Sequence, residues 1–240
     1  MKIKINLLIA LIFMVLVSCT NKPKNNFKII GEIKGIAGCD ILLMYEDPYS
    51  EQGFKIDSLK TDGDTFIFEG ITDSIRIAMI AVDNPELVVF TGGEAVPPAP
   101  VQFFIEPNGV IKIKGEVDKM NLSYLSGTQM NEQMNKLIRY TEKQQEYVDS
   151  LVYYLYKMEN SGFDTSDLHD TIRAEYMKLI DLHADFVEQN PDLDISSFIL
   201  QMYLSQYCEI DRVIELYYGL SEKVKSNLYG RAIGGMMMGF

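Results

Sequence analysis

The sequence has few of the residues that most often form catalytic and metal sites, because it contains two histidines and three cysteines. His169 and His183 lie on one helical stripe, and a rise of 1.5 Å per residue separates them by about 21 Å. Two ligands of one zinc ion each lie about 2 Å from it, so this pair cannot share an ion. His183 is instead expected to be a hydrogen-bonded core histidine.

Catalytic and cofactor motifs are missing as well. No two cysteines have C-x-x-C spacing, which excludes a dithiol redox motif. No serine lies in a G-x-S-x-G frame, which excludes the nucleophile elbow of hydrolases. Gly92-Gly93 lacks the G-x-G-x-x-G frame of dinucleotide sites. We therefore expect no catalytic residue, no metal and no cofactor.

Basic clusters and long hydrophobic runs are also scarce. Lys and Arg number 22 against 34 Asp and Glu, a net charge of -12, and such a surface repels phosphate backbones. Nucleic acid is therefore not an expected partner. The apolar run Leu7–Val17 is too short for a membrane-spanning helix, which needs about 20 residues.

The chain begins with the features of an export signal. Lys2 and Lys4 precede the apolar run Leu7–Val17, which is the arrangement of a secretory signal peptide. The stretch LVSC, which ends at Cys19, resembles the lipobox of bacterial lipoproteins. Residues 1–18 are therefore predicted to be a lipoprotein signal peptide, and the resemblance implies cleavage before Cys19 and acylation of Cys19.

Lipidation at Cys19 makes the lipid bilayer the expected partner and the bacterial cell envelope the expected location. Several acyl chains hold a protein on a membrane more firmly than one chain does. Thr20 stands where the family pattern of inner-membrane lipoproteins has aspartate, which favours the outer membrane, facing the periplasm. Residues 19–26 are polar and are predicted to be a flexible tether.

Residues 27–127 are predicted to form an antiparallel β-sandwich or barrel. Apolar and polar residues alternate in this region, as in FKIIGEIK from Phe27, and a period of two is typical of a strand with one buried face. Asp62-Gly63 and Asn108-Gly109 each separate two alternating runs. Such dipeptides favour tight turns between paired strands, so we expect a hairpin at each.

Residues 128–233 are predicted to be helical, which makes the chain an α+β protein with a C-terminal helical hairpin or bundle. Apolar residues at spacings of four and three form a seam over residues 130–158, interrupted by Thr141 and Gln144. Ser161-Gly162 is expected to turn the chain back. We expect the seam to pack on the next helix of the same chain. The alternative is that it packs on a second copy of the chain in a homodimer.

Two cysteines remain if Cys19 is acylated. Cys39 belongs to the strand region and Cys208 to the helices. These two cysteines either form a disulfide or remain two free, buried thiols. Free thiols are favoured, because nothing in the sequence brings the two positions together.

Tyrosines are numerous in the helical region. They are expected to pack in the core, with a ligand groove as the alternative. They stand at positions 153, 154, 156, 217 and 218.

Three stretches carry a resemblance to a known family, FKIIGEIKGIAGCDILLMY, IDSLKTDGDTFIFEG and FFIEPNGVIKIKGEVDKMNLSYLSGTQMNE. In this order they resemble the N-terminal domain of unknown function of lipoproteins whose C-terminal half is a thioredoxin-like, peroxiredoxin-related thiol-disulfide oxidoreductase. FVEQNPDLDISSFIL and LSEKVKSNLYGRAI resemble the helical segment that joins the two halves. The resemblance implies no catalytic residue in this sequence, because the W-C-x-x-C site of the family lies in the thioredoxin-like domain.

The stretch GRAIGGMMMGF occupies the place where that family continues into the thioredoxin-like domain, and residues 234–240 are expected to be a flexible tail. The first hypothesis is a non-catalytic, membrane-anchored envelope lipoprotein that acts as a binding or positioning module for a partner in the envelope. The second is an accessory or truncated component of a periplasmic thiol-disulfide oxidoreductase system. The third is a structural dimer formed through the seam.

Overall fold

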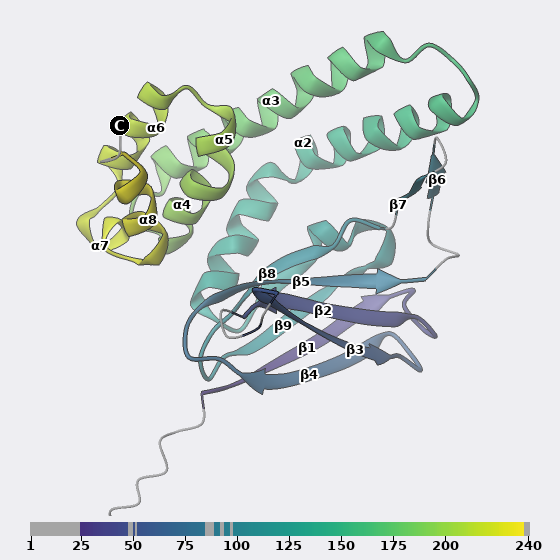
Figure 1. The fold of residues 1–240 in the computed structure, drawn as a ribbon, viewed down its shortest axis with the longest axis horizontal. Helices are drawn as coiled ribbons and strands as arrows, with labels where there is room; N and C mark the ends of the chain where they lie inside the picture. The colour runs from purple at the N-terminus through teal and green to yellow at the C-terminus, as the bar shows by residue number, and fades with distance from the viewer. Residues whose placement is uncertain are drawn as a thin grey trace, which may run out of the picture.

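The computed structural model describes residues 25–47, 50, 52–84, 89–91, 94–96 and 98–237 of the chain. The predicted signal peptide, Cys19 and the tether as far as residue 24 lie outside the described residues. A β-sandwich is followed by a helical region that begins at Gln129 (Figure 1). The predicted α+β architecture, with a sandwich first and helices second, is confirmed.

The sandwich consists of two four-stranded sheets. The first sheet has the strand order β10, β9, β1, β4, and the second has the order β3, β2, β5, β8. A separate hairpin of β6 and β7 reaches the helix α2 (Figure 1). The elements of this part are β1 (Asn26–Lys34), β2 (Asp40–Glu46), β3 (Phe54–Lys60), β4 (Thr65–Ile71), β5 (Arg76–Asp83), β6 (Val89–Thr91), β7 (Glu94–Val96), β8 (Val101–Ile105), β9 (Val110–Glu116), the short helix η2 (Val117–Leu122) and β10 (Tyr124–Ser126).

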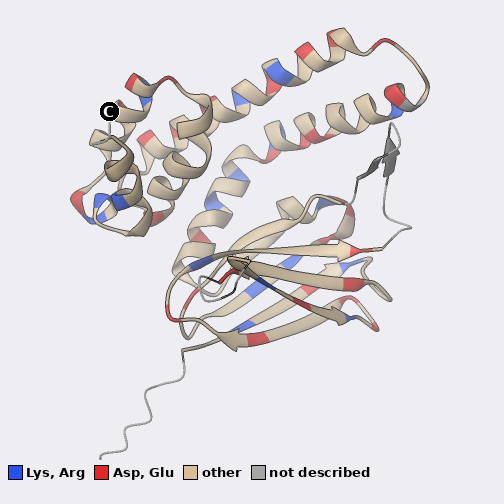
Figure 2. Cartoon of the chain, in the orientation of Figure 1, with Lys and Arg blue, Asp and Glu red and all other residues tan. Residues whose placement is uncertain are grey.

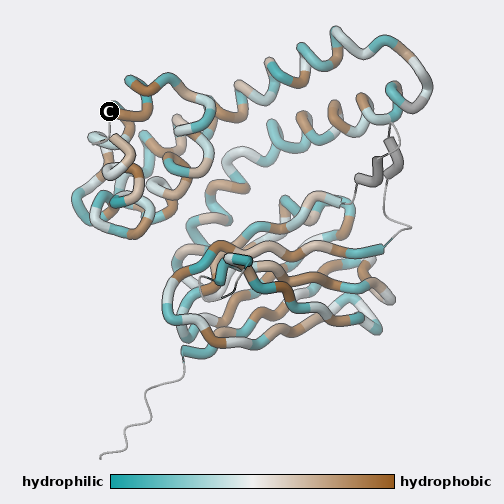
Figure 3. Tube along the Cα trace, in the orientation of Figure 1, coloured by the Kyte–Doolittle hydropathy of each residue, from teal (hydrophilic) through white to brown (hydrophobic). Residues whose placement is uncertain are grey.

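Alternation along the strands places the apolar side chains between the two sheets. Phe27, Ile29 and Ile33 of β1 are buried, while Lys28, Ile30 and Glu32 are more exposed. Ile41 and Ile80 of the second sheet are completely enclosed. Figure 3 shows hydrophobic and hydrophilic segments alternating along the strands. This pattern is what a strand with one buried face requires.

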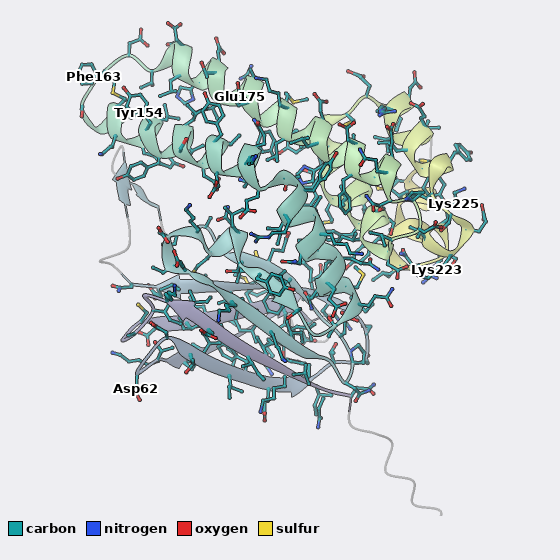
Figure 4. The ribbon with its side chains drawn as sticks, turned by 180° about the vertical axis from the view of Figure 1, so that it is seen from behind. Asp62, Tyr154, Phe163, Glu175, Lys223 and Lys225 are labelled. Carbon is teal, nitrogen blue, oxygen red and sulfur yellow. The ribbon has the colours of Figure 1, made fainter. Side chains whose placement is uncertain are left out.

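Neither of the two predicted hairpins forms. The strands on either side of Asp62-Gly63, β3 and β4, lie in different sheets, and so do β8 and β9 on either side of Asn108-Gly109. Asn108 has a φ of 61°, a left-handed conformation that asparagine tolerates, and Figure 4 shows Asp62 at the end of the sandwich. Both turns therefore carry the chain from one sheet to the other. The dipeptides favour a sharp turn, but they do not decide which strands pair. Pairing follows from which strands bury their apolar faces in the same sheet.

One strand pair departs from the all-antiparallel expectation. β1 pairs antiparallel with β4 and parallel with β9, where Ile29 lies opposite Ile111. Parallel neighbours need a long crossover connection, and here the strands of the second sheet lie between β1 and β9 in sequence. The region predicted to be an antiparallel domain is therefore a mixed β-sandwich.

The helical region starts with a long hairpin and ends with short helices. The hairpin extends over the sandwich, and the short helices gather beside it (Figure 1). The elements are α2 (Gln129–Asn160), α3 (Ser166–Gln189), α4 (Asp194–Ile199), the π-helical turn η3 (Leu200–Leu204), α5 (Ser205–Tyr207), α6 (Ile210–Gly219), α7 (Glu222–Lys225) and α8 (Leu228–Met237).

The predicted seam of α2 is used inside the chain. Met134, Leu137, Val148 and Leu155 are buried, and α2 packs along α3. Gly162 in the turn between the helices has a φ of 74°, which a residue with a Cβ rarely adopts. The favoured packing on the next helix is confirmed where α2 runs along α3, while the start of α2 contacts the sandwich.

The short helices join the sandwich through an aromatic cluster. The rings of Phe104 in β8 and Phe198 in α4 have centroids 4.9 Å apart, and those of Phe198 and Tyr229 in α8 are 5.1 Å apart. Both pairs are edge to face, an arrangement that contributes about 1 kcal/mol beyond the burial of area. The cluster therefore links the two parts of the chain.

The last described helix runs further than expected. α8 continues to Met237, so residues 234–237, which were assigned to a flexible tail, are helical. Gly234 is buried, and a Cβ at this position would lie 2.6 Å from the hydroxyl of Tyr217. This close approach packs the end of α8 on α6.

A side-chain amide joins α2 to the open edge of β8. β8 is the last strand of its sheet, so Phe104 has no strand partner on that side. Asn131 replaces the partner, because its Oδ1 accepts from the Phe104 N–H at 2.8 Å and its Nδ2 donates to the Phe104 carbonyl oxygen at 2.7 Å. Asn131 is completely buried. Both bonds are therefore shielded from water.

Asn131→Ala is expected to lower the free energy of unfolding by about 3 kcal/mol, because it leaves a buried donor and a buried acceptor of Phe104 unpaired. Asn135→Ala is the matched control, since Asn135 accepts one bond, from the N–H of Leu125 at 3.2 Å, and its loss should cost about 1 kcal/mol. Urea unfolding followed by circular dichroism measures both losses. Equal losses in the two variants would contradict the role assigned to Asn131.

Candidate functional site

A cavity of about 300 Å³ lies where the sandwich meets the helical hairpin. Its walls come from β5, β8, η2, α2, α3 and η3. The volume falls at the lower end of the range of small-molecule sites, which often lie between two structural parts. The apolar side chains of the wall are Met79, Pro100, Leu122, Met134, Leu137, Ile138 and Leu179, and the polar ones are Gln102, Asn121, Thr141, Gln145, Tyr176, His183 and Tyr203.

His183 is a buried titratable group in this wall, with 7% of its surface exposed. Its Nδ1 lies 2.8 Å from the carbonyl oxygen of Leu179. A carbonyl oxygen only accepts, so Nδ1 carries the ring proton. Burial lowers the pKa of His183 to about 4, against the opposing effect of the bond to Leu179. The ring is therefore neutral at pH 7, and the expectation of a hydrogen-bonded core histidine is confirmed.

The second ring nitrogen of His183 is an acceptor without a partner. A neutral imidazole with its proton on Nδ1 has a lone pair on Nε2, and no described residue donates to it. Nε2 is not among the wholly enclosed, unpaired side-chain atoms, and His183 lines the cavity. In the described part of the chain those enclosed atoms are Ser123 Oγ, Gln201 Oε1 and Ser221 Oγ.

Tyr203 fixes the ring of His183 and joins the helices to the sandwich. The two rings are stacked, with centroids 5.1 Å apart and planes 13° apart. The Tyr203 hydroxyl donates to Gln102 Oε1 at 2.6 Å, which leaves Nε2 of Gln102 as its donor group. Tyr203 lies in the π-helical turn η3, and such turns are frequent at functional sites.

A carboxylate behind the wall orients two amides. Asn121 Nδ2 and Gln145 Nε2 each donate to a different oxygen of Asp149 at 2.8 Å. Asp149 itself does not line the cavity. Each amino group uses one of its two N–H bonds on Asp149, so Asn121 and Gln145 each keep an oxygen that can accept a hydrogen bond and one further N–H that can donate.

The wall carries no charge at neutral pH. The described residues that form it include no Asp, Glu, Lys or Arg. Burial is the main cause that raises the pKa of Tyr203 and of Tyr176 to about 12, and the Tyr207 hydroxyl adds to the effect on Tyr176. Figure 2 shows acidic and basic residues interspersed along the strands and helices. The cavity can therefore hold polar groups through hydrogen bonds but offers no ion pair.

The other histidine lies elsewhere. His169 is exposed at the surface, where its Nε2 is 3.1 Å from Glu159 Oε1. Within the ranges that the structure describes, no three or more His, Cys, Asp or Glu side chains gather as metal ligands would. The two histidines thus share no site.

The structure leaves Cys39 and Cys208 as free thiols. Cys39 is buried in the sandwich, and its Sγ accepts a hydrogen bond from Asn84 Nδ2 at 3.3 Å. Cys208 is half-buried, and burial raises the pKa of its thiol. Cys19, the predicted lipidation site, lies outside the described residues. No helix among those described has both the length and the apolar character that a bilayer crossing requires.

The tyrosines singled out in the sequence do not form the site. Tyr153 and Tyr154 are half exposed and Tyr218 is 69% exposed, which differs from the core packing expected for them. Figure 4 shows Tyr154 and Phe163 at the end of the α2 and α3 hairpin. Tyr176 and Tyr203 line the cavity instead. The signals for the site in the sequence were the stripe of α3 that contains His183 and the polar interruptions of the seam.

A larger hollow of about 580 Å³ lies at one end of the first sheet. Its rim includes Lys28 and Glu69, which form an exposed ion pair at 2.7 Å, and Ile71, which is 64% exposed. Exposed charged pairs fix their geometry weakly. The smaller cavity, with its buried and oriented polar groups, is therefore the candidate site.

Comparison with known proteins covers the sandwich and the start of α2. Residues 27–134 match the family model described as "Domain of unknown function (DUF4369)". No curated protein matches the chain. The match supports the resemblance as far as a domain of unknown function, and the connection with thioredoxin-like proteins stays a hypothesis.

The stability of the protein is expected to depend on the protonation of His183. Its pKa falls from 6.5 in the unfolded chain to about 4 in the fold, so the unfolded state binds the proton more readily between these values. Stability is then complete above pH 6.5 and falls by about 3 kcal/mol as the pH is lowered to 4.

The free energy of unfolding of the wild type in urea should therefore exceed that of His183→Gln by about 3 kcal/mol less at pH 4 than at pH 7. His169→Gln is the control for the loss of a surface histidine. A constant difference between wild type and His183→Gln across this range would show that His183 titrates normally.

Proposed function

We propose that this protein is a non-catalytic, membrane-anchored lipoprotein of the bacterial cell envelope that acts as a binding module, with the cavity as its binding site. The observation that carries the proposal is that the polar groups of the wall are already held in place. Tyr203 holds Gln102, and Asp149 holds two amides. Groups that are ordered before a ligand arrives reduce the entropic cost of binding.

The neighbours of His183 favour binding over catalysis. A histidine with a pKa of about 4 is a weak base at neutral pH. The one aliphatic hydroxyl in the described wall belongs to Thr141, and it donates to the carbonyl oxygen of Leu137 at 3.0 Å. An activated nucleophile needs its base within hydrogen-bonding reach, whereas this hydroxyl is engaged by the backbone.

Anchoring is supported by the predicted signal peptide and by acylation of Cys19. β1 starts at Asn26, seven residues after Cys19, and an extended chain spans about 3.5 Å per residue. The sandwich would then stay within about 25 Å of the bilayer surface. Such a tether would position the binding site close to the membrane.

Cys19→Ala is expected to move the protein from the membrane fraction to the soluble fraction of fractionated cells, because the acylated residue is lost. Cys39→Ser is the matched control, since it removes the buried thiol of the sandwich and should leave the protein on the membrane. Immunoblots of the two fractions measure the distribution. Retention of Cys19→Ala on membranes would refute lipid anchoring at this residue.

The binding part of the proposal is tested with benzofuran, an uncharged bicyclic aromatic compound. Calorimetric titration of the full chain, with a blank that contains the same detergent, is expected to show one binding site. The physical reason is that uncharged walls with apolar patches take up uncharged aromatic molecules. If neither benzofuran nor its analogue indole binds, the cavity is not a binding site.

The second candidate is an accessory component of a thiol-disulfide oxidoreductase system. It is favoured by the resemblance of FVEQNPDLDISSFIL and LSEKVKSNLYGRAI to the joining segment of the thioredoxin-like lipoproteins, since these stretches form helices that pack beside the sandwich. Crosslinking in cells followed by mass spectrometry would favour this candidate if it identified a thioredoxin-fold partner on these helices.

A further inference from the structure

We infer that the cavity takes a small, uncharged ligand with an apolar body and a hydrogen-bond donor, and that the donor binds Nε2 of His183. This inference rests on the proposed binding function and specifies the chemical class of the ligand. It comes from the acceptor that the fold leaves open, the absence of charge in the described wall and the size of the cavity.

The need for a donor follows from the way His183 is held. Nδ1 is committed to the Leu179 carbonyl oxygen, and stacking on Tyr203 fixes the plane of the ring. Nε2 is left as an acceptor at a side chain that is more than nine-tenths buried. A polar group in such a place is ordinarily satisfied by water, and a ligand that displaces the water without replacing its bond loses affinity.

The ligand must also be uncharged. No described residue of the wall supplies a counter-charge, and burying an unpaired charge is strongly unfavourable. The carboxylate behind the wall, Asp149, already accepts one hydrogen bond from Asn121 and one from Gln145. A ligand carboxylate would therefore find no cation among the described residues of the wall.

The size and the apolar part of the wall define the body of the ligand. Met79, Leu137 and Leu179 contribute apolar surface from three different elements. The volume of about 300 Å³ is about twice that of an engineered cavity that holds one benzene molecule. A bicyclic aromatic molecule, or an aliphatic one of similar size, fits this space.

Indole and benzofuran test the inference, because they have nearly the same shape and only indole has an N–H donor. Calorimetric titration of the full chain is expected to show that indole binds about tenfold more tightly than benzofuran. Indole-3-carboxylate keeps the N–H and adds a charge, so it should bind at least about tenfold more weakly than indole.

Two variants test whether His183 accepts the hydrogen bond from the ligand. His183→Phe keeps a planar ring beside Tyr203 and removes the acceptor, so the preference for indole should fall below about twofold. His169→Phe is the matched control, since it makes the same exchange at the exposed histidine beside Glu159, which lies outside the wall, and leaves His183 in place. The preference should persist in this variant, and thermal unfolding checks that both variants are folded.

The outcomes separate the ligand class from the binding function. Equal affinities for indole and benzofuran in the wild type would overturn the ligand class and leave the binding site standing. A preference that survives in folded His183→Phe would overturn the assignment of His183. Failure of both compounds to bind would overturn the inference together with the proposed function. If His183→Phe does not fold, the wild-type comparison decides.

Discussion

The open edges of the two sheets impose the constraint on which the rest of the structure depends. β8 and β10 are the last strands of their sheets, and the backbone groups along such an edge need partners. Amides in the first two turns of α2 supply them, because Asn131 bonds the backbone of Phe104 twice and Asn135 bonds that of β10. Gln133, between them, accepts from the N–H of Ile195 at the start of α4. One segment of α2 thereby fixes both sheets and the short helices to each other.

This attachment also explains why a cavity exists beside α2. The helix is held to the sandwich at its start and then changes direction, so that its second half runs along α3 (Figure 1). Thr141 donates to the carbonyl oxygen of Leu137, and bonds of this kind bend helices. A space remains between β8, the two long helices and η3, and it is bordered by the bond from Tyr203 to Gln102.

The sequence predicts the features of this structure that depend on neighbouring residues. The change from strands to helices after Gly127, the turn at Gly162 and the burial of His183 each follow from periodicity or from a single turn. The two predicted hairpins, β3 with β4 and β8 with β9, were wrong for two reasons. The partner of a strand can lie far away in sequence, and the same turn dipeptide fits either a hairpin or a crossing between sheets. The site was missed for a related reason, since Gln102 and Tyr203 are 101 positions apart and neither belongs to a local pattern.

The two polar interruptions of the seam were nevertheless local signs of the site. Polar residues in a heptad seam cost stability, and departures from consistent packing are expected where a protein has a function. Gln144 ties α3 in place, because its Nε2 donates to the carbonyl oxygen of Glu175 at 2.9 Å and to its carboxylate at 3.0 Å. Thr141, one turn earlier, lines the cavity. A leucine at position 141 and at position 144 would extend the apolar contact between α2 and α3. Gln144 instead holds α3 by hydrogen bonds, and Thr141 presents a small side chain to the cavity. This arrangement supports the proposal that the junction of the sandwich and the helices holds a ligand.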